Sequence, residues 1–79
     1  MALVFSIELD DRNFRSAHPT NLVCKYLVAE TDGKKILQLN SYGSKGRDIP
    51  GKLSQTLQFT EESAEQLFHV LKREFGFKG

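Results

Sequence analysis

The dipeptide Asp32-Gly33 constrains the fold of this chain more than any other feature of its sequence. It lies between two runs in which apolar and polar residues alternate, residues 22–31 and 34–42. An Asp-Gly pair in this setting is the strongest short-range signal for a β-hairpin. With Asp32 and Gly33 as the two turn residues, Thr31 pairs with Lys34, and the numbers of every opposed pair sum to 65.

This pairing separates two faces of the hairpin. One face is mainly apolar, and we expect it to form the core together with Leu57 and Phe59 of a later strand. Its hairpin members are Cys24, Tyr26, Val28, Leu37, Leu39 and Ser41. The other face mixes apolar and polar groups, which makes it a candidate binding surface. Its members include Lys25, Leu27, Gln38, Asn40 and Tyr42.

Patterning also predicts the elements on either side of the hairpin. Period-two alternation predicts strands at residues 3–9 and 53–59. Residues 10–21 are mostly polar and predict a long loop, and residues 43–52 predict a second loop that is rich in Gly, Lys and Arg. The chain therefore divides into four strands before its last segment.

The last segment, residues 61–75, has the marks of an amphipathic helix. Thr60 is a candidate N-cap, and Gly76 is a candidate C-terminal stop with Phe77 placed for a hydrophobic contact. Residues at helical spacing make one apolar stripe, namely Ala64, Leu67, Phe68, Leu71 and Phe75. We therefore predict a single α+β domain over residues 1–79, a four-stranded antiparallel sheet followed by one helix that packs across it (ββββα).

Size and composition exclude several classes of protein. A chain of 79 residues buries only about 60% of its unfolded surface, so a dimer interface is a natural supplement to its core. It has no apolar run of the roughly 20 residues that span a membrane, and residues 1–9 lack the features of a secretory signal. The lone Cys24 excludes an internal disulfide and a Cys-rich zinc site. These features predict a cytoplasmic protein, associated with the nucleoid if it binds DNA.

Positive charge is concentrated in the middle of the chain. Residues 33–58 carry five Lys or Arg and one Asp, a net charge of +4, although the whole chain has a net charge of only +1. Basic groups beside a Tyr and uncharged hydrogen-bonding side chains suit single-stranded nucleic acid, which needs phosphate neutralisation and a stacking surface. The alternative is an ordinary solvated surface in which Lys34 and Lys35 balance Asp32 and Glu30.

Residues 33–42, a 13-residue spacer and residues 56–67 together resemble the transcriptional positive-cofactor-four family. The shared pattern is a Gly-Lys hairpin turn, an apolar strand that ends in an aromatic, a basic Gly/Pro loop, a short strand and a helix that contains Glu-Gln. The resemblance implies a homodimer that binds single-stranded DNA on the outer face of its sheet. It gives Lys34 and Tyr42 the roles of a basic residue after the turn and of the strand-end aromatic.

The sequence departs from the family pattern at three of these positions. Gly43 stands where the family has a Trp, Asn40 where it has a basic residue, and Thr31 where it has an aromatic before the turn. Stacking on an aromatic is worth about 1–3 kcal/mol per base, so these differences predict weaker binding.

Motifs that carry out catalysis or hold a cofactor are missing from the sequence. His18 and His69 have no partners at metal-ligand spacing, and the acidic pair Asp10-Asp11 suits a solvated strand end. No Ser or Cys has a nucleophile context. We therefore expect no enzyme activity, no catalytic residue, no metal and no cofactor.

The sequence thus predicts a small protein that binds single-stranded DNA or RNA with low sequence specificity, in transcription or in DNA repair and replication. The expected contact residues are Lys25, Lys34, Gln38, Asn40, Tyr42, Lys45, Arg47, Lys52, Thr56 and Gln58. One alternative is a protein-interaction module that uses the same face, with Tyr42, Ile36 and Leu27 as anchors. Another is an accessory domain of a larger enzyme complex.

Overall fold

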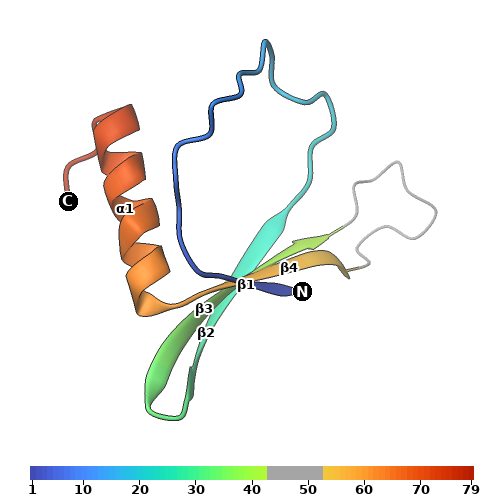
Figure 1. Ribbon diagram of the computed structural model, residues 1–79. Coiled ribbons are helices and arrows are strands. Elements are labelled where there is room, and N and C mark those ends of the chain that lie inside the picture. Colours follow the sequence, from blue (N-terminus) through green and yellow to red (C-terminus); the bar gives the residue numbers. More distant parts are fainter. Residues whose placement is uncertain (43–52) are drawn as a thin grey trace.

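A computed structural model describes residues 1–42 and 53–79 of the chain, and the predicted basic loop 43–52 lies outside the described residues. Four strands precede one helix, which confirms the predicted α+β order ββββα (Figure 1). The elements are β1 (Ala2–Val4), β2 (Cys24–Thr31), β3 (Lys34–Tyr42), β4 (Leu53–Phe59) and α1 (Glu61–Phe75). The bounds of β3, β4 and α1 are those expected from the pattern.

The hairpin of β2 and β3 has the predicted register. Its eight opposed pairs run from Cys24 with Ser41 to Thr31 with Lys34. Asp32 and Gly33 have φ angles of 53° and 75°, the left-handed conformation that a two-residue hairpin turn of this kind requires. The first strand of the hairpin begins two residues later than expected, at Cys24.

The sheet is mixed, which corrects the expectation of an antiparallel sheet. Its strand order is β1-β4-β3-β2, with β1 parallel to β4 and the other two pairs antiparallel. A short hairpin between β1 and β2 would have made these two strands antiparallel. Instead, residues 5–23 leave the sheet and return to it, and a connection of this length permits either direction (Figure 1).

Strand β1 is also shorter than the predicted strand 3–9. After Val4 the chain leaves the sheet and runs beside α1, where the backbone N–H of Ile7 donates to Oε1 of Gln66 over 2.7 Å. The alternation in residues 5–9 therefore belongs to a segment outside the sheet, which is hydrogen-bonded to α1 at Ile7.

The ends of α1 have the predicted caps. The hydroxyl of Thr60 accepts from the backbone N–H of Ser63 over 3.1 Å, and Oγ of Ser63 accepts from the backbone N–H of Thr60 over 2.9 Å. Gly76 ends the helix with φ of 73°, and its N–H donates to the carbonyl of Lys72. The capping role of the fully buried Ser63 was not predicted, because capping-box patterns favour Glu or Gln there.

Replacement of the N-cap tests this end of the helix. Thr60→Ala leaves the N–H of Ser63 without its acceptor, and we expect a loss of about 1 kcal/mol of unfolding free energy. In a domain of this size, that loss lowers the Tm by roughly 4–8 °C, measured by circular dichroism. Thr20→Ala, in an exposed loop, is the matched control and should leave the Tm unchanged. An equal effect of both substitutions would contradict the capping role.

The two faces of the sheet are defined by the register. The helix face carries Cys24, Tyr26, Val28, Lys35, Leu37, Leu39, Leu57 and Phe59, and the outer face carries Lys25, Leu27, Ala29, Lys34, Ile36, Gln38, Asn40, Tyr42, Thr56 and Gln58. Strand β1 adds Leu3 to the outer face, opposite Gln58.

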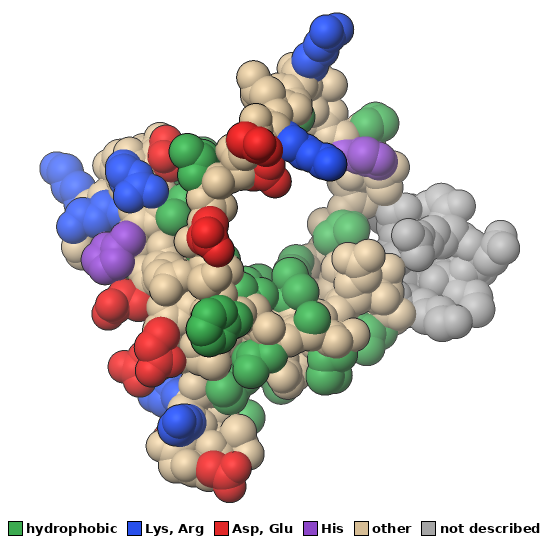
Figure 2. Space-filling model, in the orientation of Figure 1, with side chains coloured by type: hydrophobic (Ala, Val, Ile, Leu, Met, Phe, Trp, Pro, Cys, Tyr) green, Lys and Arg blue, Asp and Glu red, His purple; other side chains and the backbone are tan. Residues whose placement is uncertain are grey.

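The helix does not pack across the sheet, which corrects a second expectation. Its first turn meets the sheet at Phe59, and the rest of α1 rises away from it (Figure 1). Phe59, 5% exposed, is the one buried apolar side chain among the described residues, while Val28 is 50% exposed and Cys24 is exposed as well. Figure 2 shows an opening through the molecule whose sheet side is bordered by hydrophobic side chains. The predicted core is therefore an open apolar face.

Candidate nucleic-acid interface

A hydrogen-bonded ladder of polar side chains crosses β3 and β4 on the outer face. Nε2 of Gln58 donates to Oε1 of Gln38 over 2.9 Å, and Nε2 of Gln38 donates to Oδ1 of Asn40 over 3.0 Å. The hydroxyl of Thr56 donates to the same Oδ1 over 3.0 Å. The ladder forms because the register places Gln38 opposite Gln58 and Asn40 opposite Thr56.

The members of the ladder differ in exposure. Asn40 and Thr56 are buried, at 9% and 7% exposure, whereas Gln38 and Gln58 are half-buried. Within the described residues, no buried side-chain nitrogen or oxygen is left without a partner. A buried polar network that is fully satisfied is rigid, so Asn40 and Thr56 hold the two glutamine amides at fixed positions on the surface.

Loss of the shared acceptor tests the ladder. Asn40→Ala leaves the Thr56 hydroxyl and one Gln38 donor without their partner, and an unsatisfied buried group costs about 1–3 kcal/mol. We expect urea unfolding to show a loss in that range with the slope unchanged. Asn21→Ala, at an exposed loop position, serves as the control. If Asn40→Ala were as stable as the control, the ladder would not contribute to the fold.

A cation and an aromatic ring lie together beside the ladder. Nζ of Lys25 is 5.1 Å from the centre of the Tyr42 ring, within the range of a cation–π interaction. Lys25 comes from β2 and Tyr42 from β3, which are neighbouring strands. The backbone N–H of Tyr42 donates to the carbonyl of Val23 over 3.1 Å, which holds the two strands together at this end of the hairpin. A positive charge and a flat ring are thus held at one end of the outer face.

An apolar groove of about 400 Å³ continues the outer face on the other side of the ladder. Its walls include Leu3, Leu27 and Ile36, and the side chains of Gln38 and Gln58 line it as well. The outer face therefore presents, in order along β3, a ring with a cation, a row of amides and an apolar groove.

Six of the ten predicted contact residues come together on this surface. They are Lys25, Gln38, Asn40, Tyr42, Thr56 and Gln58. Lys34 shares the face but lies at the other end of β3, roughly 26 Å along the strand from Tyr42. There it lines a cavity with Glu30, Glu61 and Glu62. Lys45, Arg47 and Lys52 lie outside the described residues.

Leu3 lies on the outer face and lines its groove, which the sequence pattern did not predict. The alternation of Leu3 with Val4 places these two residues on opposite faces. The pairing of β1 with β4 decides which face Leu3 occupies, and no residue near Leu3 in the sequence predicts that pairing. In the part of the chain that the structure describes, no group of three or more His, Cys, Asp or Glu side chains could hold a metal ion. No helix of residues 1–42 or 53–79 has the length and apolar character to cross a membrane.

Comparisons with protein-family models, with curated proteins and with solved structures found no match to this chain. The resemblance of residues 33–67 to the positive-cofactor-four family stays a prediction.

Proposed function

We propose that this chain is a non-enzymatic protein that binds single-stranded DNA or RNA through the outer face of its sheet, with little sequence preference. One observation carries the proposal, namely the Lys25–Tyr42 pair beside a satisfied row of amides on the outer face of the sheet. Single-strand binding needs a ring for stacking next to a positive charge for the backbone, and this arrangement supplies both.

Each side chain has a definite task in this proposal. Tyr42 stacks on a base, and Lys25 neutralises the phosphate beside it. The exposed parts of Gln38 and Gln58 bond to bases or sugars, and every base offers them an acceptor or a donor. Asn40 and Thr56, which the sequence predicted as contacts, act by holding those amides because both are buried.

The sequence adds further cations to the proposed site. Lys34 would bind the nucleic-acid backbone at the hairpin end. Three basic residues that follow Tyr42 in the sequence would bind further phosphates, namely Lys45, Arg47 and Lys52. We place the protein in the cytoplasm, as its sequence features predict, with a role in transcription or in DNA repair and replication.

The apolar groove favours a second candidate function, a protein-interaction surface. Leu27 and Ile36 line the groove, and Leu27 is 45% exposed. Apolar anchors with polar neighbours are typical of protein interfaces. The two candidates differ in their response to salt, because phosphate contacts weaken steeply as salt rises and apolar contacts do not.

Fluorescence anisotropy of labelled oligonucleotides of about 20 nucleotides tests the proposal. We expect the chain to bind the single strand more tightly than the duplex at about 50 mM salt. The affinity should fall with a log–log slope of about −0.7 for each phosphate neutralised. No binding to either strand form at low salt would overturn the nucleic-acid proposal. Retention of a protein partner after nuclease treatment would then support the second candidate.

A further inference from the structure

Residues of all four strands line the apolar groove of the outer face. Leu3 of β1 and Leu27 of β2 form part of its walls and are 54% and 45% exposed. The volume of about 400 Å³ lies within the range of about 300–1,000 Å³ that is usual for small-molecule sites. A flat apolar group that entered the groove would therefore remove apolar surface from water on both molecules, which favours binding.

Each of the described side chains that line the groove is uncharged. An ion that entered it would lose its hydration without gaining a charged partner, which is costly. The polar groups at the groove are the amides of Gln38 and Gln58 and the hydroxyl of Thr31. The groove therefore suits a neutral group that has apolar faces and a hydrogen-bonding edge.

The ladder leaves part of each glutamine amide free. A glutamine amide has two N–H donors and a carbonyl oxygen that accepts two bonds. Within residues 1–42 and 53–79, Gln58 uses one donor, and Gln38 uses one donor and one of its acceptor positions. Each amide thus keeps a donor and an acceptor. Every nucleobase carries a donor and an acceptor side by side on its Watson–Crick edge, where proteins read unpaired bases.

The groove lies in line with the Lys25–Tyr42 pair. Gln38 is four residues before Tyr42 on β3, a distance of roughly 13 Å along the strand. Lys25 lies between these two positions, because it pairs with Asn40 on β3. A cation thus stands between a ring and a groove, as a phosphate stands between the bases of a single strand.

We propose that the groove binds one unstacked nucleobase of a bound single strand. The faces of the base lie against Leu27 and Ile36, in the way that extruded bases lie between apolar side chains. Its edge bonds to the free donors and acceptors of Gln38 and Gln58. This inference rests on the proposed function and adds a second base contact to the one at Tyr42. Because the amides offer both a donor and an acceptor, the groove takes any of the bases.

The amides favour a base over an apolar side chain of a partner protein. A Leu or Phe side chain would cover Leu27 and Ile36 equally well. It would also shield the free parts of the Gln38 and Gln58 amides from water without giving them a partner, and such groups are costly to leave unsatisfied. A base covers the walls and satisfies the amides together.

Ala29 lines the groove at an exposed position, so it allows the groove to be filled without the loss of an existing side chain. We expect Ala29→Leu to weaken the binding of a dT oligonucleotide of about 8 nucleotides at least about 10-fold in fluorescence anisotropy. The salt slope should stay the same, because no phosphate contact is lost. Ala17→Leu makes the same change in an exposed loop and should leave the affinity unchanged.

An abasic strand of the same length separates the groove from the phosphate contacts. It carries the same phosphates but no bases, so Ala29→Leu and Ala17→Leu should bind it equally. With the dT oligonucleotide, equal affinity of these two variants would overturn the groove as a base site.

A second measurement needs only the wild-type chain. In its complex with the dT oligonucleotide, we expect NOEs from thymine methyl protons to the methyl groups of Leu27 and Ile36. A bound strand with NOEs to the Tyr42 ring but none in the groove would overturn the inference and leave the proposed function standing. The groove would then be left to a protein partner. No binding of the strand at low salt would overturn both.

Discussion

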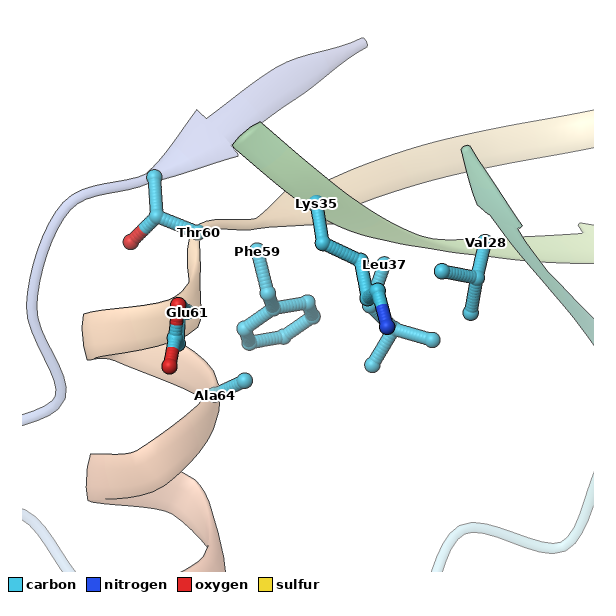
Figure 3. A pocket seen from close by; sticks show the side chains of 7 residues that line it. All are labelled: Val28, Lys35, Leu37, Phe59, Thr60, Glu61 and Ala64. Atoms are coloured by element: carbon cyan, nitrogen blue, oxygen red, sulfur yellow. The ribbon is translucent and has the colours of Figure 1, made fainter. Parts of the chain in front are cut away.

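Phe59→Ala is expected to remove a large share of the unfolding free energy of the chain. Phe59 is 5% exposed, and its ring lies between Ala64 of α1 and Leu37 of β3 (Figure 3). It is the side chain through which the sheet and the helix are joined. Removal of a buried Phe costs about 3–5 kcal/mol. A chain of 79 residues has only about 4–12 kcal/mol of stability to lose.

Far-UV circular dichroism and urea unfolding measure this effect. Phe14→Ala removes the same atoms from a side chain that is 81% exposed, and we expect it to change stability by less than about 0.5 kcal/mol. If both substitutions had the same small effect, Phe59 would not be the junction of the fold.

The double substitution Lys25→Ala/Tyr42→Ala is expected to remove most single-strand binding. Loss of the ring costs about 1–3 kcal/mol of stacking, and loss of one phosphate contact also reduces the salt slope by about 0.7. Together the two losses should weaken binding at least about 100-fold at low salt. The effect on unfolding should be small, because a cation–π pair at an exposed site contributes about 0.5–1 kcal/mol.

Two further variants separate the contributions of the pair. Tyr42→Phe keeps the ring and should bind within about threefold of the wild type, since stacking needs the π-face and not the hydroxyl. Lys25→Ala alone should reduce the salt slope, and it should change the affinity at high salt only slightly. Equal binding by the wild type and the double variant would show that the Lys25–Tyr42 pair is not part of the interface.

The parts of the fold that were predicted correctly depend on local signals. The Asp32-Gly33 turn sets the register of β2 with β3, and Thr60 and Gly76 set the ends of α1. Each of these signals acts within a few residues. The hairpin register in turn brought Lys25, Gln38, Asn40 and Tyr42 to one face, so four of the six residues that come together followed from one turn.

The parts that were predicted wrongly depend on contacts between distant segments. The direction of β1 is set by its pairing with β4, more than 50 residues away, and no turn signal reports it. The amphipathic pattern of α1 predicts that one stripe is buried, but it does not predict which surface buries it. The same pattern serves a helix that packs across its own sheet and one that meets the sheet only at its first turn.

The two faces of the sheet therefore have different tasks in this account. The helix face is apolar, half exposed in the single chain, and joined to α1 at Phe59. The outer face is held rigid by the ladder of Gln38, Asn40, Thr56 and Gln58 and is proposed to bind nucleic acid. A substitution on one face should leave the task of the other face intact.

An NMR titration shows which face of the sheet contacts single-stranded nucleic acid. An unlabelled single-stranded oligonucleotide is added to the isotope-labelled chain, and shifts of backbone amides and of the Gln side-chain amides are followed. We expect the largest shifts at Lys25, Gln38, Tyr42 and Gln58, with little change at Val28 and Leu71. No shifts at saturating oligonucleotide, or shifts confined to the helix face and α1, would contradict this expectation.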